Sequence, residues 1–327
     1  MMFSQLVSTG SALPKNAVSN EELARRLSEI GVETSDEWIT ERTGIKQRYL
    51  ADGEPGISTT ELAVRAARKA LEKGGLVPSE IDMIIVATTT PDKLFPSTAC
   101  QVQAALGCTG AAAFDIQAVC SGFVYAMSLA DSLIRSGAKR CVLVIGSEML
   151  SRILDWKDRT TCVLFGDGAG AAILRASEEP GILATELGAD GSFGSDVLAV
   201  DARLEQGSVV GDPFIRMDGR TVFRMAVEKL SSGALSVLEK SGFRPEDVDL
   251  YIPHQANLRI MKMVAHKLGI PEERMMVSVD THGNTSAASV PLSLDKAVQS
   301  GRIRKGSLVL LQGVGGGFTW GSVLLRI

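Results

Sequence analysis

Short apolar runs alternate with amphipathic segments along the whole chain. Residues 81–86 form a largely apolar run in which apolar and polar positions do not alternate, as in a strand that is covered on both faces. After Ser58, apolar residues recur at helical spacing between positions 62 and 71, and Gly74-Gly75 ends that segment. Apolar strands that alternate with helices predict an α/β protein with a mostly parallel sheet.

Three segments carry the Ser/Thr-x-x-Glu pattern of a capping box, in which side chains bond the free N–H groups of a helix start. We therefore predict that helices begin at Ser19, Thr34 and Ser58. A longer helix is expected from about residue 120 to residue 136. Because this segment is apolar on nearly every face, we predict that it lies in the middle of the protein.

The chain repeats itself at a nearly constant offset. Residues 80–86 resemble residues 247–253, and residues 141–146 resemble residues 308–313, in both cases 167 positions later (313 − 146 = 167). Units of this size are too long for a solenoid repeat. They indicate a duplicated α/β domain.

We predict that the halves span residues 1–177, which hold a cap insertion, and residues 178–327, and that the active site lies where they meet. Cys120 and Asn284 fall at nearly equivalent positions of the repeat. Different side chains at matched positions suggest that the two halves divide a catalytic task.

Length and composition narrow the class of protein. The length of 327 residues suits two domains or one double domain, and 45% hydrophobic with 22% charged residues is typical of a globular protein. A net charge of −4 without runs of like charge gives no reason to expect a nucleic-acid partner.

The N-terminal sequence, the apolar stretches and the cysteine pattern favour a cytosolic location. The N-terminus lacks the features of a signal peptide, and the most apolar stretch, residues 111–130, contains Asp115, which indicates buried core rather than a membrane span. Five cysteines without a Cys-x-x-Cys pair argue against both a disulfide framework and a zinc site. A reducing, cytoplasmic location fits best.

Cys120 lies where a predicted strand leads into the buried helix. The free N–H groups at a helix start favour thiolate, and cysteines so placed have pKa values of about 3.5–7.5. The same geometry offers the backbone N–H of Cys120 to an oxyanion. Position alone leaves two interpretations open, a nucleophile or a small buried hydrophobe.

The three histidines differ in their expected surroundings. His254 follows an apolar strand at its carboxyl end, where α/β proteins build their sites. His266 lies in an amphipathic helix and is expected to be solvated, and His282 is expected to be either exposed or behind the site. Asn284 could cap a helix or donate to an oxyanion in the cavity that Cys120 faces.

Two glycine-rich stretches have different meanings. Residues 166–170 lack the Gly-x-Gly-x-x-Gly spacing, so we reject a nucleotide-binding loop there. Residues 315–317 follow a strand, and glycines at that place allow a backbone N–H to approach a ligand closely.

Four motifs together resemble the pattern of one known family. They are the sequence Asp-Ile-Gln-Ala-Val-Cys-Ser-Gly-Phe around Cys120, Pro253-His-Gln-Ala-Asn, Gly283-Asn-Thr-Ser-Ala-Ala-Ser and Gly315-Gly-Gly-Phe-Thr-Trp-Gly. Residues 35–45 and 95–99 extend the match to segments without catalytic residues. The whole chain therefore resembles the β-ketoacyl-acyl-carrier-protein synthase III family.

This resemblance implies a thiolase-like fold, a duplicated α/β domain layered α-β-α-β-α with buried helices between two sheets. It also implies the condensation that starts type II fatty-acid synthesis, in which acetyl-CoA and malonyl-acyl-carrier protein give acetoacetyl-acyl-carrier protein. Cys120 would carry the acyl group, and the N–H groups of Cys120 and Gly316 would hold the oxyanion. His254 and Asn284 would stabilise the enolate that follows decarboxylation. No cofactor or metal is implied, since acetyl-CoA is a substrate.

The resemblance also assigns residues to coenzyme A, with Trp38 and Arg159 on the two faces of the adenine. The expected contacts are Thr34, Trp38, Arg42, Arg159, Gly219, Phe223 and Asn257. For the acyl pocket it implies Phe165, Val314 and Phe95, the last inserted from the partner subunit of a homodimer.

A further segment would bind the acyl-carrier protein. It consists of Gln255, Ala256, Asn257, Leu258 and Arg259. A basic patch for the acidic carrier would be made by Arg224, Arg259 and Lys267, with Lys262 one turn away, and its main effect would be faster docking.

The chain departs from the family pattern at three places. Val314 stands where the family usually has Phe, and His266 stands where Lys is common. Residues 25–32 contain a small insertion with no evident function.

Related activities remain as alternatives. A thiolase would need a second cysteine near residues 313–318, and the elongating synthases have His where this chain has Asn284. The remaining enzyme alternative is a paralogue that primes with a longer acyl-CoA or acts in secondary metabolism. The alternative without catalysis is a scaffold in an acyl-carrier complex, which the combination of Cys120, His254 and Asn284 disfavours.

Overall fold

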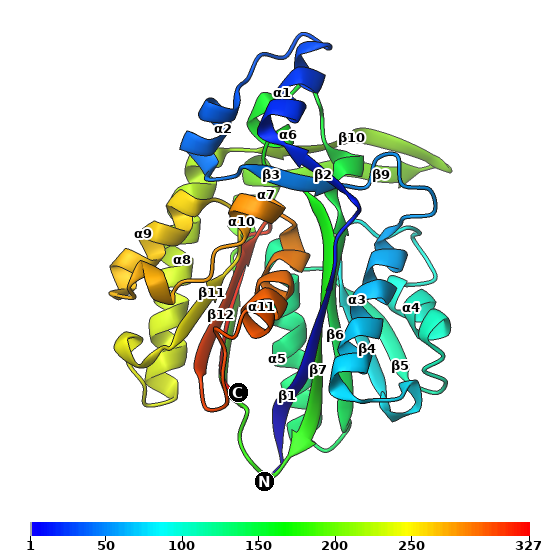
Figure 1. Ribbon diagram of the computed structural model, residues 1–327. Helices are drawn as coiled ribbons and strands as arrows, with labels where there is room; N and C mark the ends of the chain where they lie inside the picture. The colour runs from blue at the N-terminus through cyan, green and yellow to red at the C-terminus, as the bar shows by residue number, and fades with distance from the viewer. Residues whose placement is uncertain (1) are drawn as a thin grey trace.

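Two β-sheets enclose a pair of buried helices, and further helices cover the outer face of each sheet (Figure 1). The computed structural model describes residues 2–327. The first sheet has the strand order β1-β7-β6-β4-β5, and the second has the order β11-β12-β13-β8. Their bounds are β1 Phe3–Ala12, β4 Met83–Ala87, β5 Ala112–Ile116, β6 Cys141–Met149, β7 Asp167–Ser177, β8 Ile182–Ala189, β11 Leu250–Pro253, β12 Leu308–Gly315 and β13 Thr319–Arg326.

The helices occupy three layers. The middle layer holds α5 (Gly122–Arg135) and α11 (Ser289–Gln299), which contact strands of both sheets. On the outer side of the first sheet lie α3 (Thr59–Gly74) and α4 (Thr98–Leu106), and on that of the second lies α8 (Gly219–Lys240), with α9 (Leu258–Leu268) packed on α8. The predicted layered, thiolase-like α/β fold is confirmed.

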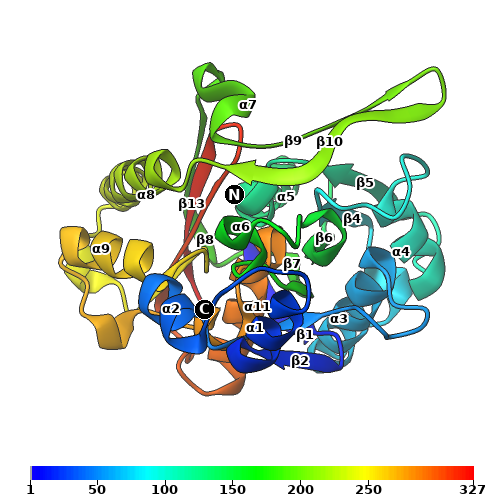
Figure 2. The ribbon, with the colours of Figure 1, turned by 90° about the horizontal axis from the view of Figure 1, so that it is seen from above.

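Smaller elements form a cap at one end of the sheets, and the β9–β10 hairpin projects from the cap beside the body (Figure 2). The cap consists of α1 Asn20–Ser28, α2 Asp36–Thr43, α6 Arg159–Cys162, α7 Gly194–Val197, α10 Val279–His282, β2 Asn16–Ser19, β3 Gln47–Leu50, β9 Leu198–Glu205 and β10 Ser208–Met217. Among residues 2–327, no helix combines the length and the apolar character that a bilayer span requires.

The strand order of the second sheet repeats that of the first. Strands β8, β13, β12 and β11 take the places of β1, β7, β6 and β4, and both β4 and β11 pair in parallel with their neighbours β6 and β12. Where the first sheet has its fifth strand, β5, the second sheet has an isolated bridge between Tyr251 and Met275. The first residues of the central helices differ by 289 − 122 = 167, the offset found in the sequence. The division of the chain after residue 177 stays a prediction.

Two local expectations were wrong. The sheets are mixed rather than mostly parallel, because β1, β7, β8 and β13 all pair antiparallel with their neighbours. Ser35 rather than Thr34 caps α2, since its side chain accepts the N–H of Trp38. By the position of the helices the counterpart of Cys120 is Ala287 (120 + 167 = 287), three residues from Asn284, in keeping with the expected near equivalence.

The two halves meet through the turns that lead into α5 and α11. A Cβ added to Gly146, within β6, would lie 2.2 Å from the carbonyl oxygen of Ala287. A Cβ added to Gly313, in β12, would lie 2.8 Å from Cα of Ser121. Since 313 − 146 = 167, Gly146 and Gly313 occupy equivalent positions in the repeat. Each makes room for the helix-initiating turn of the opposite half.

We predict that Gly146→Ala destabilises the protein by about 1–3 kcal/mol or more, because the added methyl group overlaps a backbone that cannot move freely. The thermal unfolding midpoint measures the effect. Gly191→Ala is the matched control, since a Cβ there meets nothing within 4 Å. Equal midpoints for both variants would contradict the close contact between the halves.

Candidate active site

One cavity of about 240 Å³ brings together the three residues that the sequence singled out. Cys120, His254 and Asn284 all line it, although they come from different segments of the two halves. Apolar side chains make up most of the remaining wall, namely Val163, Leu164, Phe165, Leu198, Met217, Val222, Phe223, Ala226, Ile260, Val314 and Phe318.

Cys120 lies in a strained turn. The short 3-10 helix Val119–Ser121 joins the loop after β5 to α5, and Val119 has φ 48°. Such backbone in a non-glycine residue costs about 1–3 kcal/mol and is held only where the surroundings enforce it. Gly315 provides part of this enforcement, because a Cβ there would lie 2.6 Å from the backbone nitrogen of Cys120. The turn therefore holds Cys120 at the amino end of α5, as the sequence predicted.

The thiol itself differs from the expectation. Burial raises the pKa of Cys120 to about 12, and the nearby carboxyl group of Glu148 acts in the same direction, against a hydrogen bond from Ser286. This direction is opposite to the lowering to about 3.5–7.5 that the sequence predicted. Removing a thiolate from water costs free energy, and this cost acts against the predicted effect of the helix start.

His254 directly follows β11 and is held from two sides. Its backbone N–H donates to the carbonyl oxygen of Gln312 at 2.7 Å, and its Nδ1 lies 2.5 Å from Oγ of Ser289. Only 3% of its surface is exposed, and burial lowers the pKa of His254 to about 3. The imidazole is therefore neutral at physiological pH.

Asn284 is fixed through both its backbone and its side chain. Its N–H donates to the carbonyl oxygen of Leu164, and its carbonyl oxygen accepts the N–H of Gly166, each at 2.9 Å. Its Oδ1 accepts the backbone N–H of Ser286 at 2.9 Å. Because the amide oxygen is engaged there, the Nδ2 group is the part of Asn284 left to donate into the cavity.

Glu148 is a buried acid beside the nucleophile, and the sequence analysis missed it. Its carboxyl group accepts hydrogen bonds from Oγ1 of Thr90 at 2.6 Å and from Oγ of Ser286 at 3.2 Å, and also from Thr88 and Thr89. Burial raises the pKa of Glu148. The signal in the sequence was an acidic residue close after the apolar run that begins at Cys141. The structure shows this segment as the wholly buried strand β6.

The chain's own side chains lie over the expected adenine site. Two guanidinium groups lie over the indole of Trp38, with Cζ of Arg42 at 4.6 Å and Cζ of Arg159 at 4.5 Å from the ring centre. Arg159 also donates to the carbonyl oxygen of Glu33 at 2.8 Å. An adenine can stack on Trp38 only on a face of the indole that neither guanidinium group covers.

The other expected coenzyme A contacts lie partly in the cavity. Gly219, Phe223 and Asn257 line it together with Trp38 and Arg42, whereas Thr34 and Arg159 do not. Asn257 caps α9 by accepting the N–H of Arg259 at 2.8 Å and donates to the carbonyl oxygen of Arg42 at 3.0 Å. It thus ties α9 to α2.

The segment expected to bind the carrier protein is only partly accessible. Gln255 is fully buried, and its side chain bonds the backbone of Pro253, Met276, Ser278 and Val279. The expectation that Gln255 contacts a carrier protein is therefore wrong, because its amide shapes the loop from inside. Ala256 and Leu258 are half-buried, and Leu258 packs over Gly44.

The expected basic patch lies on the surface of α8 and α9. Arg224, Arg259 and Lys267 are exposed, and Arg224 and Lys267 border a groove of about 380 Å³ that Phe223 and Met263 also line. Lys262 instead forms an ion pair with Glu272 at 2.8 Å. His266 is exposed on the same helix, as the sequence predicted, whereas His282 is largely buried against Tyr49.

Only some of the residues expected in the acyl pocket and the oxyanion site line the cavity. Phe165 and Val314 line the cavity, while Phe95 is 84% exposed on the surface of this chain. Gly315 lines the cavity and lies against Cys120, whereas a Cβ on Gly316 would face Leu198. Within residues 2–327, no three His, Cys, Asp or Glu side chains are grouped so that they could hold a metal ion.

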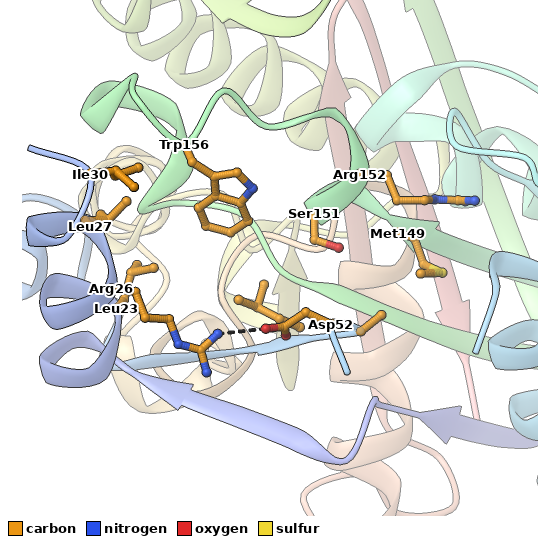
Figure 3. A pocket seen from close by; sticks show the side chains of 11 residues that line it. Leu23, Arg26, Leu27, Ile30, Asp52, Met149, Ser151, Arg152 and Trp156 are labelled. Carbon is orange, nitrogen blue, oxygen red and sulfur yellow. Dashed lines mark hydrogen bonds and ion pairs between the residues drawn. The ribbon is translucent and has the colours of Figure 1, made fainter. Parts of the chain in front are cut away.

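A larger cavity of about 420 Å³ lies elsewhere, between α1 and the segment after β6 (Figure 3). Arg26 and Asp52 form an ion pair at its wall, and Trp156 closes one side. Leu27 and Ile30 show that the insertion at residues 25–32 builds part of this wall. None of the three catalytic candidates borders this cavity, so it is separate from the candidate active site.

Comparisons with known proteins agree with this geometry. The family model described as 3-oxoacyl-[acyl-carrier-protein] synthase III matches residues 114–191, and the model of its C-terminal part matches residues 238–327. β-Ketoacyl-[acyl-carrier-protein] synthase III of Bordetella petrii is 57% identical over 327 residues, which cover 100% of this chain and 99% of that protein.

Two crystal structures show the same fold. That of 3-oxoacyl-[acyl-carrier-protein] synthase III from Aquifex aeolicus is 49% identical with a TM-score of 0.92 and covers 99% of this chain and 100% of its own. That of the priming β-ketosynthase from the R1128 polyketide biosynthetic pathway is 38% identical with a TM-score of 0.92, over 99% and 96% of the two chains.

We predict that alkylation of Cys120 by iodoacetamide accelerates about tenfold per pH unit from pH 7 to pH 10 without levelling. A thiol with a raised pKa stays protonated through this range, so its reactive thiolate fraction keeps growing with pH. Peptide mass spectrometry reports the Cys120 peptide separately from the other cysteines, and a Cys100→Ser background removes the exposed one. A plateau below about pH 8 would show instead that the helix start outweighs burial.

Proposed function

Because this chain belongs to the β-ketoacyl-[acyl-carrier-protein] synthase III family, also named 3-oxoacyl-[acyl-carrier-protein] synthase III, we propose that Cys120, His254 and Asn284 carry its reaction. The chain is an acyltransferase that condenses acetyl-CoA with malonyl-acyl-carrier protein and so initiates type II fatty-acid synthesis. The observation that supports the assignment of residues is the single cavity that all three line.

The first stage is acyl transfer to Cys120. Its Sγ attacks the thioester carbonyl of acetyl-CoA, and the N–H groups of Cys120 and Gly316 hold the oxyanion. The C–S bond to coenzyme A then breaks, and the departing sulfur carries the thiol proton. A neutral thiol at rest is compatible with this stage, since the proton that leaves Cys120 ends on the product. Each oxyanion donor contributes about 3–4 kcal/mol to lowering the barrier.

The second stage is decarboxylation and condensation. Malonyl-acyl-carrier protein replaces coenzyme A, its carboxylate leaves as carbon dioxide, and the electron pair remains as an enolate whose oxygen accepts hydrogen bonds from His254 and Asn284. The carbanion attacks the acyl group, and the thiolate of Cys120 leaves and regains a proton from solvent. The acyl-cysteine divides one difficult condensation into two easier steps. Beyond acetyl-CoA as a substrate, the reaction requires no cofactor.

The partners follow from exposed features of the chain. Coenzyme A enters beside Trp38, on a face of the indole that neither guanidinium group covers. The carrier protein docks on the exposed Arg224, Arg259 and Lys267, whose charge complements an acidic partner. A second copy of this chain covers Leu94 and Phe95, which are 76% and 84% exposed, and the homodimer works in the cytoplasm, where its five free thiols stay reduced.

A longer primer is the second candidate, and Val314 favours it. This residue lines the cavity where a phenylalanine is usual in the family, which leaves more room for an acyl chain. The structural likeness to a priming β-ketosynthase of a polyketide pathway is in keeping with such a role.

Incubation with acetyl-CoA should add the mass of one acetyl group to the intact protein, and peptide mapping should place it on Cys120. Cys120→Ser should take up none. The same measurement with a series of acyl-CoAs of increasing length reports the primer, and acylation that peaks beyond acetyl would favour the second candidate. An unmodified Cys120 with every acyl-CoA would reject acyl transfer and leave a scaffold role.

Trp38→Ala should raise KM for acetyl-CoA by about tenfold, equivalent to about 1.4 kcal/mol of binding, with kcat little changed. The physical reason is the loss of stacking on the adenine, so a truncated thioester without the nucleotide should react equally well with both proteins. Trp156→Ala is the matched control, because Trp156 lines the separate cavity. A KM that stays at the wild-type value would rule out Trp38 as the adenine platform.

A further inference from the structure

The two ring nitrogens of His254 face different surroundings. Nδ1 lies 2.5 Å from Oγ of Ser289, the first residue of α11, while the ring borders the cavity with Cys120 and Asn284. Ser289 is 1% exposed, so this hydrogen bond is shielded from water. Because burial keeps His254 neutral, only one of its two nitrogens carries a proton.

The direction of this hydrogen bond decides which nitrogen is protonated. Oγ of Ser289 also accepts the backbone N–H of Gln255 at 3.3 Å. If Nδ1 were protonated, both neighbours would donate to Oγ, and the hydroxyl proton would need a third partner. Within the described residues, His254 and Gln255 are the only partners of this hydroxyl. A buried hydroxyl proton without an acceptor is unfavourable, so the hydroxyl donates to Nδ1 and the ring proton sits on Nε2.

We propose that Ser289 is a positioning residue that holds His254 as the Nε2–H tautomer, so that the imidazole presents a hydrogen-bond donor to the cavity. This inference rests on the proposed function and deepens it. Asn284 shows the same arrangement, since the backbone N–H of Ser286 engages its Oδ1 and leaves Nδ2 to donate. One short segment, residues 284–289, therefore aims both donors.

The tautomer determines which step His254 assists. Two N–H donors suit the thioester oxygen, which gains negative charge as the carbon–carbon bond to the carboxylate breaks. The opposite tautomer would point a lone pair of Nε2 at that oxygen and repel it. An Nε2–H group cannot accept the thiol proton of Cys120, so His254 and Ser289 act in decarboxylation and not in acyl transfer.

Nitrogen NMR of the wild-type protein tests the assignment directly. The chain has three histidines, so histidine labelled with ¹⁵N in the ring gives few signals, and His266→Gln and His282→Gln assign them. We expect His254 to show a protonated Nε2 and an unprotonated Nδ1 at every pH from about 5 to 9, because burial keeps its pKa low. A protonated Nδ1 would overturn the proposal.

Variants of Ser289 test the catalytic consequence. Ser289→Ala should lower kcat for malonyl decarboxylation by about 10- to 100-fold, with KM unchanged. Losses of this size are common when a hydrogen bond that orients a histidine in a metal site is removed. Acylation of Cys120 by acetyl-CoA should stay near the wild-type rate, and Ser289→Thr should restore decarboxylation because it keeps the hydroxyl. In the alanine variant the ¹⁵N signals should show loss of the single tautomer.

Ser293→Ala provides the matched control. Ser293 is a fully buried serine one turn further along α11, and its hydroxyl bonds Ser278 and the carbonyl oxygen of Ser289 rather than His254. This variant should decarboxylate like the wild type. Equal losses in the two variants, or equal losses of both half-reactions in Ser289→Ala, would reduce Ser289 to a packing residue.

The test separates this inference from the proposed function. If wild-type Cys120 takes up no acyl group, the proposed function fails, whatever the ring protonation of His254. If Cys120 is acylated but Nδ1 carries the proton, only the assignment of Ser289 fails.

Discussion

The site depends on one steric constraint, the close approach of each helix-initiating turn to a glycine in the opposite half. Gly146 in β6 leaves room for the carbonyl oxygen of Ala287, and Gly313 in β12 leaves room for Ser121. The two glycines stand at equivalent places in the repeat, so the contact is reciprocal. Any side chain at either position would push the two halves apart, and the nucleophile would then lose the donors that the other half supplies.

The constraint also explains why strained backbone persists at both turns. Val119 and Ser286 have φ values of 48° and 49°, and their positions differ by 167 (286 − 119 = 167). Close packing enforces a conformation that these residues would otherwise avoid, since Val119 is half-buried against Gly315 and Ser286 is 1% exposed. As a result Cys120 meets the start of α5 on one side and the Asn284 loop on the other, in a cavity walled mostly by apolar side chains.

Burial sets the chemistry of this cavity. It raises the pKa of Cys120 and lowers that of His254, so both groups are neutral at rest. Charge that develops during the reaction must then be met by oriented N–H groups rather than by a standing ion pair. The buried serines and Gln255 serve this purpose, since their hydrogen bonds fix the loops that carry the donors. Glu148 adds a further buried network that joins β6, the Thr88–Thr90 loop and Ser286.

The sequence by itself determined the duplicated α/β architecture through its hydrophobic periodicity and repeat spacing. It identified the three candidate residues through their positions and through motifs that resemble one family, because all of these features can be read along the chain. It placed Cys120 at the start of the buried helix and His254 at the end of a strand correctly. Only the tertiary structure decided the mixed strand directions, the burial of Gln255 and the roles open to Ser286, Ser289 and Glu148. Strand direction depends on pairing between segments that are distant in the sequence. The pKa of Cys120 and the orientation of the His254 ring also depend on groups far away in the chain, and residue spacing does not show which groups these are.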